Sequence, residues 1–184
     1  MIKTKISKNS AVRYFICTLF LLPFITVCHA ATAPLVCEDI SQLKIIGELE
    51  YVSVIPEALR QKARIDTGAQ TSSMGIMDSV FFERDGKKWV RFHVKDKIQN
   101  SVVEFERPLK RIAKIKRHQA EATERPVVEL KIKLGQIELL REFSLADRSQ
   151  FKYPILIGRN VLNNKFLVNV GQKFSSSKIK EYEQ

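Results

Sequence analysis

The chain has 184 residues, of which 45% are hydrophobic and 28% charged, which fits one packed domain and excludes an intrinsically disordered chain. Its 7 Gly, 6 Pro and 3 Cys exclude a collagen-like chain and a disulfide scaffold. Lys and Arg number 31 against 20 Asp and Glu, a formal net charge of +11 that favours an anionic partner.

The first thirty residues have the pattern of an export signal. Residues 1–13 hold four cations and no acid, residues 14–27 are apolar, and Cys28-His29-Ala30 places small residues where a signal peptidase cuts. As a helix, the apolar stretch would span about 21 Å, too short for the ~30 Å of membrane hydrocarbon. We expect a signal peptide over 1–30 and a periplasmic or secreted protein. An uncleaved membrane anchor is the alternative.

Removal of the signal would take away four of the 31 cations and lower the formal net charge from +11 to +7. Cys37 would then be the one remaining cysteine, either paired between chains or a bystander near the new terminus. The remaining positive charge is compatible with an anionic membrane surface, but it is spread along the chain and locally dense only at 108–118. No nucleic-acid-binding motif is present, so we expect no nucleic-acid partner.

The rest of the chain has the pattern of many short strands. Asp85-Gly86 lies between two β-rich runs, which is a strong hairpin signal. One short helix is expected over 158–163, and 175–184 is polar. The expected strands are 45–54, 59–65, 79–84, 87–94, 101–105, 126–134, 137–145, 154–157 and 166–170.

This organisation predicts an all-β protein, either a small barrel or a sandwich. No internal repeat or linker divides it. The expected segments are a signal peptide over 1–30, an N-terminal extension over 31–44, one domain over 45–174 and a polar tail over 175–184.

The sequence lacks the motifs of several common kinds of catalytic and binding site. There is no His-Glu-x-x-His, and the two histidines after the signal, His93 and His118, lie far apart in sequence, so with Cys37 they predict no zinc site. No Gly-rich phosphate loop and no Gly-x-Ser-x-Gly elbow are present. We therefore expect no metal and no cofactor.

Two segments carry the strongest functional signal. Residues 63–69 read Ala-Arg-Ile-Asp-Thr-Gly-Ala, so that a strand delivers Asp66 into a tight turn. Residues 154–162 read Pro-Ile-Leu-Ile-Gly-Arg-Asn-Val-Leu, an apolar strand that ends on glycine. Together they resemble the two halves of the retroviral-type aspartic protease site, in which two carboxylates share a proton and activate a water.

More of the chain is similar to a bacterial retropepsin-like family once labelled an ATP-dependent zinc protease, although these residues support neither ATP nor zinc. The similarity covers 45–170 and is carried by 62–73, 88–94, 125–128, 145–148 and 153–162. It implies a small closed acid-protease barrel with one short C-terminal helix, and a homodimer that hydrolyses peptide bonds in a peptide or protein substrate.

The same resemblance implies roles for individual residues. Asp66, with Thr67 and Gly68, would be catalytic, one Asp66 coming from each chain. Ala69, Ser72 and Ser73 are expected at the substrate, the two serines either touching it or stabilising the turn. Support for the loop would come from Ile157, Gly158 and Arg159.

The chain departs from the retroviral pattern in two places. Where those enzymes carry a second Asp that pairs with the arginine, this chain has Gln70, so Arg159 needs another partner, and Asp147 is a candidate. The glycine-rich flap is also missing, and the basic hairpin region 109–124 is either the lid or a solvated loop.

Two rival functions stay open. The chain could be a non-catalytic β-barrel module of the envelope that binds a peptide or an anionic polymer. It could also be a structural accessory of a larger envelope complex.

Overall fold

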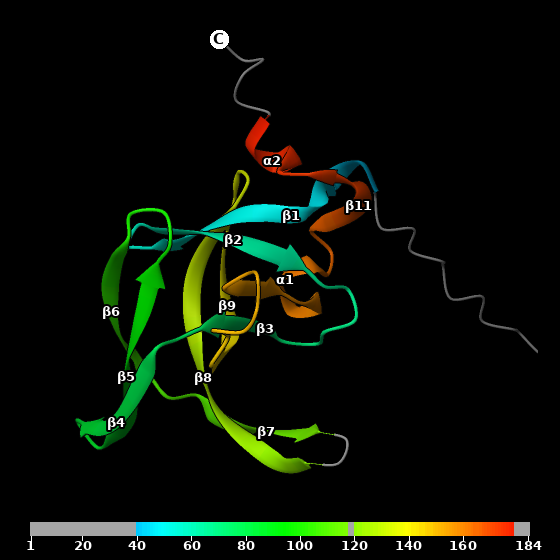
Figure 1. The fold of residues 1–184 in the computed structure, drawn as a ribbon. Helices are drawn as coiled ribbons and strands as arrows, with labels where there is room; N and C mark the ends of the chain where they lie inside the picture. Colours follow the sequence, from blue (N-terminus) through cyan, green and yellow to red (C-terminus); the bar gives the residue numbers. More distant parts are fainter. Residues whose placement is uncertain (1–39, 118–119, 179–184) are drawn as a thin grey trace, which may run out of the picture. The chain divides into compact units, whose positions relative to one another are not determined.

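Six strands close into a barrel whose ring order is β1-β2-β10-β3-β9-β8, with β8 pairing back onto β1 (Figure 1). The structure, a computed structural model, describes residues 40–117 and 120–178. The strand β11 adds to β1 in parallel outside the ring, and β7 extends from β8. A separate three-stranded sheet has the order β4-β5-β6.

The elements follow one another along the chain as short strands with brief helical turns. Their bounds are η1 Ile40–Gln42, β1 Lys44–Ile55, β2 Leu59–Ile65, β3 Ser72–Gly75, β4 Asp78–Arg84, β5 Lys87–Asp96, β6 Ser101–Pro108, β7 Arg111–Arg117, β8 Ala120–Leu134, β9 Ile137–Ala146, β10 Ile155–Ile157, α1 Arg159–Leu162, β11 Phe166–Lys173 and α2 Ser175–Lys178.

Alternation of side chains explains the barrel strands. Along β2 every second residue, from Leu59 to Ile65, is buried, and the residues between them are exposed. On β8 the four alternating apolar residues of 128–134 are all fully buried. Each such side chain contributes about 1.5–3 kcal/mol when it leaves water. The all-β barrel expected from the sequence is thus confirmed.

The three-stranded sheet shares the barrel's core. Phe92 of β5 and Phe105 of β6 stack with ring centroids 5.1 Å apart, and both belong to the same buried cluster as the barrel residues. The expected hairpin is present: Asp85 and Gly86 connect β4 to β5, with φ of 52° and 67°. Two positive φ values in a two-residue turn suit the twist of a hairpin.

Four elements were not among the expected strands and helix: η1, the strands β3 and β7, and the helix α2. The polar tail expected over 175–184 begins with this ordered helix, and Ser176 in it is buried. The helix is fixed by Glu50, a fully buried carboxylate on β1 that accepts hydrogen bonds from Ser175 Oγ (2.9 Å) and from Ser176 N (3.2 Å) and Oγ (2.6 Å). Gly47 N donates the fourth, at 2.7 Å.

The predicted signal peptide 1–30 and Cys37 lie outside the described residues. Within 40–117 and 120–178, no helix has the length and apolar character needed to cross a membrane. The predicted division into segments and the predicted location stay predictions.

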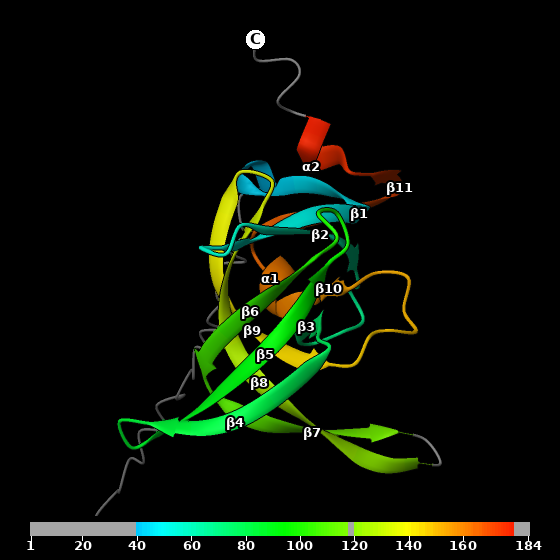
Figure 2. The same ribbon diagram turned by 60° about the vertical axis from the view of Figure 1, so that its left-hand side comes forward.

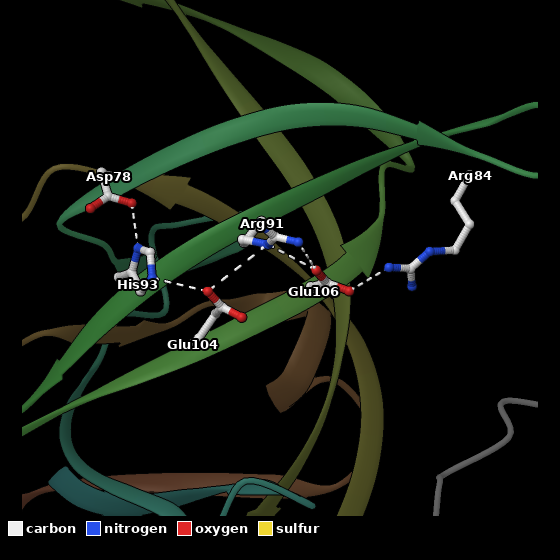
Figure 3. Close-up of polar contacts among 6 residues, drawn as sticks. All are labelled: Asp78, Arg84, Arg91, His93, Glu104 and Glu106. Atoms are coloured by element: carbon white, nitrogen blue, oxygen red, sulfur yellow. Dashed lines mark hydrogen bonds and ion pairs between the residues drawn. The ribbon is translucent and has the colours of Figure 1, made fainter.

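A ladder of charged side chains crosses the solvent-facing side of the β4-β5-β6 sheet (Figure 3). His93 on β5 lies between Asp78 on β4 (Nδ1–Oδ1, 2.6 Å) and Glu104 on β6 (Nε2–Oε2, 3.2 Å). Arg91 donates to Glu106 at 2.5 Å, and Arg84 donates to the same carboxylate at 2.7 Å. The hydrogen bond to Asp78 is the largest cause that raises the pKa of His93.

We expect the His93 pKa to lie above the ordinary value of about 6.5 and to fall in Asp78→Asn. Because the folded-state pKa is the raised one, the stabilisation is fully present below pH ~6.5 and is lost as pH rises through the folded-state value. An NMR titration of the ring measures the pKa in both proteins. Glu83→Gln, on the same strand, is the matched control. A wild-type pKa at or below the ordinary value would contradict the ladder.

Candidate active site

Asp66 lies where β2 ends and the chain turns toward β3. Its backbone N donates to Ile157 O at the end of β10, at 2.9 Å. Its carboxylate accepts hydrogen bonds from Gly68 N at 2.9 Å and from Ala69 N at 3.2 Å. Both bonds use Oδ1, so the turn fixes the orientation of the carboxylate without using Oδ2. The side chain is only half-buried, and Thr67 and Gly68 beside it are exposed.

Close backbone approach explains the two glycines of the site. A Cβ on Gly68 would lie 3.2 Å from Asp66 Oδ1. A Cβ on Gly158 would lie 2.8 Å from Ala69 O and 3.0 Å from the Thr71 carbonyl carbon. Gly158 therefore lets the end of β10 pack directly onto the backbone of the Asp66 loop.

The turn after β10 binds the loop along its length. Arg159 N donates to Ala69 O at 2.8 Å, and Asn160 N donates to Gln70 O at 3.1 Å. The Arg159 side chain reaches further, with Nη1 donating to Thr67 O at 3.0 Å and to Gly68 O at 2.8 Å. Ile157, Gly158 and Arg159 thus lie beside the Asp66 loop.

The partner of Arg159 is not Asp147. Backbone carbonyls of the loop take its hydrogen bonds, and the Asp147 carboxylate instead accepts from Ser149 N at 2.8 Å. This bond lowers the pKa of Asp147 and fixes the start of the β9–β10 loop. The interpretation of Asp147 as the substitute partner is therefore wrong.

Ser72 and Asn160 form the second tie between the loop and α1. Ser72 N and Oγ donate to Asn160 Oδ1 at 2.9 and 2.8 Å, and Gly158 N donates to Ser72 Oγ at 3.0 Å. Asn160 Nδ2 donates to Glu142 O on β9 at 2.8 Å. Ser72 is fully buried, so of the two roles considered for it, the contacts fit the stabilising one. Asn160 was not among the predicted site residues, although the Gly-Arg-Asn motif contains it.

Arg148 is a second residue that the sequence reasoning missed, although its segment 145–148 carried part of the resemblance. It lies on the β9–β10 loop, and its Nη1 donates to Ser73 Oγ at 3.0 Å. Burial lowers the pKa of its guanidinium, the charge of Arg125 lowers it further, and the charge of Asp66 raises it. The guanidinium of Arg148 therefore lies within electrostatic reach of both Asp66 and Arg125. Ser73 is buried beneath this arginine, which again fits the stabilising role.

The basic hairpin expected over 109–124 is formed by β7 and the first part of β8. In Figure 2 it projects toward the same side as the β2–β3 turn and the β9–β10 loop. A pocket of ≈ 320 Å³ lies between the Asp66 loop and the base of the hairpin. Its lining includes Gln70, Thr71, Arg111, Leu140, Arg141 and Asn160. A lid function for the hairpin stays a prediction.

No group of three or more His, Cys, Asp or Glu side chains within 40–117 and 120–178 has the geometry to hold a metal ion. The arrangement presents instead one fixed, half-buried carboxylate, Asp66. Its loop is held by hydrogen bonds from the β10–α1 segment, residues 157–160. Such a carboxylate can act as a general base or acid toward a bound water.

Comparison with known proteins agrees with this geometry. A family model described as "Retropepsin-like aspartic endopeptidase RimB" matches residues 45–179. A crystal structure of a protein of unknown function (DUF785) from Legionella pneumophila has a TM-score of 0.64 and 30% identity, covering 72% of this chain and 98% of that one.

Curated relatives carry a different name. A "Probable alpha-L-glutamate ligase" from Shewanella pealeana is 34% identical over 116 residues, 61% of this chain and 25% of the relative. A protein of the same name from Desulfotalea psychrophila is 34% identical over 140 residues, 72% of this chain and 29% of the relative. The chain thus spans little more than a quarter of the length of these relatives.

Replacing Gly158 by Ala tests the close packing of the β10–α1 segment on the Asp66 loop. We expect Gly158→Ala to lower the free energy of unfolding by about 1–3 kcal/mol, because the new Cβ meets rigid backbone of the Asp66 loop. Chemical denaturation measures the change. In Gly171→Ala, the matched control, the Cβ meets only a side-chain oxygen of Asn169, at 3.3 Å. Equal free energies of unfolding of the two variants would show that there is room for a Cβ between residue 158 and the Asp66 loop.

Proposed function

The chain belongs to the RimB-like family of retropepsin-like aspartic endopeptidases, and from this membership we propose that it hydrolyses peptide bonds. The reaction would use a water activated by two Asp66 carboxylates, one from each chain of a homodimer. The observation that carries the proposal is the Asp66 turn, in which backbone N–H groups of Gly68 and Ala69 hold one carboxylate oxygen. The proposal needs no metal or nucleotide.

The proposed chemistry follows from two carboxylates in close contact. Like charges at short distance cannot both ionise, so one carboxyl keeps a proton while the other is a general base. The base removes a proton from the water as its oxygen attacks the scissile carbonyl carbon. The protonated carboxyl donates its proton to the carbonyl oxygen, which gives a tetrahedral diol. Proton transfer to the amide nitrogen then breaks the C–N bond and releases an amine and a carboxylic acid.

The need for a second chain comes from the sequence itself. It contains one Asp-Thr-Gly, and the remaining candidate carboxylates lack its setting. Asp85 lies at an exposed hairpin tip, and Asp147 is held by Ser149. A two-fold axis that relates two Asp66 loops would supply the missing carboxylate, and this is the commonest symmetry of homo-oligomers.

The name of the curated relatives bears on the substrate and not on the reaction of this chain. Those proteins are named for ligating L-glutamate, but this chain matches only a quarter of their length, so we do not transfer that activity. What the name supports is the class of substrate. Arg148 interacts with Asp66, and Arg159 lies on the Asp66 turn, so the cations beside the loop favour an acidic peptide. A non-catalytic module that binds such a peptide is the alternative.

We expect Asp66→Asn to abolish cleavage and leave the fold intact. Asn can still accept the two turn hydrogen bonds through its amide oxygen, but it cannot take the proton of the water. Loss of a general base or acid usually lowers the rate about 10²–10⁴-fold. A peptide-library digest compares wild type with the variant, and Asp85→Asn is the matched control. Retained turnover would place the chemistry elsewhere, and a wild type without turnover would favour the binding module.

We also expect specific activity to fall on dilution, because the dyad exists only in the dimer. Analytical ultracentrifugation would show dissociation over the same concentration range. Excess Asp66→Asn chains should inhibit the wild type by forming mixed dimers with one functional carboxylate, whereas excess Asp85→Asn chains should not. A monomer with undiminished specific activity would refute the shared dyad.

A further inference from the structure

A groove separate from the pocket at the Asp66 loop runs beside the β9–β10 loop. The backbone of this loop is drawn in Figure 2. It consists of two pockets of ≈ 420 Å³ and ≈ 400 Å³ that share Lys97 and Pro154. One pocket continues past Gly75 and Arg148. The other continues past Lys62, Lys152 and Phe174.

Exposed lysines give the groove more positive than negative charge. Lys62, Lys95, Lys97 and Lys152 border it and are exposed, and within the described part of the chain none forms an ion pair. Among the described residues, four lysines outside the groove do form ion pairs, for example Lys131 with Glu138 at 3.0 Å. Asp147 is the one acidic residue of the lining. The site therefore favours an anionic ligand.

Apolar side chains and aromatic rings lie among these lysines. Ile98 and Met77 line the groove and are 54% and 58% exposed. The Lys62 ammonium lies 5.8 Å from the Phe174 ring centroid. A ligand that carries both carboxylates and apolar groups would match this surface, whereas a phosphate backbone would leave the apolar part unused.

The groove is built on fixed backbone. Asp96, which is 2% exposed, accepts hydrogen bonds from Ile98 N (2.8 Å) and Gln99 N (3.0 Å), and these bonds fix the backbone of the β5–β6 turn on both sides of Lys97. Gln61 Nε2 donates to Lys95 O at 3.1 Å and joins β2 to β5 beneath the groove.

The groove also lies within reach of the Asp66 loop. Lys62 and Asp66 are four residues apart on β2 and its end, about 13 Å at 3.3 Å per residue. Four residues of extended polypeptide cover the same distance. Arg148 lines the groove and is hydrogen-bonded to Ser73 next to the Asp66 loop.

We propose that this groove is an exosite for an acidic stretch of the substrate polypeptide, rich in carboxylates with interspersed apolar residues and lying outside the segment that is cleaved. The inference rests on the proposed function for the identity of the ligand as substrate. It assigns to Lys62, Lys97 and Lys152 a role in binding that is separate from catalysis.

The test measures binding of a fluorescein-labelled peptide of Glu and Leu to full-length Asp66→Asn protein by anisotropy. Changing Lys62, Lys97 and Lys152 to Gln should raise the Kd about tenfold, as expected for three exposed ion pairs. The matched control changes Lys87, Lys88 and Lys165, three exposed lysines away from the groove, to Gln and should leave the Kd unchanged. The peptide with every Glu replaced by Gln should bind weakly to all proteins.

Equal affinity of the groove and control variants would overturn the exosite, as would equal binding of the two peptides. Binding of a single-stranded oligonucleotide that depends on the three groove lysines, without binding of the peptide, would also overturn it. A second test uses protein in which Asp66 is unchanged. There, changing the three groove lysines to Gln should raise KM for a substrate that carries an acidic extension and leave cleavage of the same substrate without the extension unchanged. If no substrate is cleaved while groove-dependent peptide binding is observed, the proposed function fails and the binding site stands.

Discussion

The arrangement of the site depends on a three-residue strand, β10, that lies between β2 and β3. It runs parallel to β2 and antiparallel to β3, so its end reaches the turn that joins them. From there the backbone of 157–160 satisfies the donors and acceptors of the Asp66 loop. Each such hydrogen bond contributes only about 0.5–1.5 kcal/mol net, but an unpaired buried backbone group would cost more. The loop is therefore held in one geometry by a segment about ninety residues away in sequence.

The parts of the fold that follow a two-residue period could be predicted from the sequence, and the parts that depend on distant polar contacts could not. The bounds of β2 were predicted to the residue, because its apolar residues alternate with charged ones. Ser72 and Ser73 of β3 are polar, and they are buried only because Asn160 and Arg148 supply hydrogen bonds. In the same way, the motifs predicted that 63–69 and 154–162 come together, whereas the placement of Arg148 depends on tertiary structure.

The exchange of an acidic residue for Gln70 changes the electrostatics of the site. Arg159 donates to two neutral carbonyls, and within the described residues no carboxylate pairs with it. Its charge thus adds to that of Arg148 and to the lysines of the groove. The fold of the family is kept, but Arg159 brings a positive charge to the Asp66 loop that no carboxylate within the described residues pairs with. A relative with a salt-bridged arginine at this place would present a weaker field to an anionic ligand.

The contacts of Glu50 limit where the domain can end. Three of the four hydrogen bonds to its carboxylate come from Ser175 and Ser176, only Gly47 N being independent of them. A protein shortened after Phe174 would expose this carboxylate or leave it buried with one donor, at a cost of about 1–3 kcal/mol or more. Expression boundaries and C-terminal fusions must therefore lie beyond Ser176. A protease that trims the tail back to β11 would loosen β1 at the strand that closes the barrel.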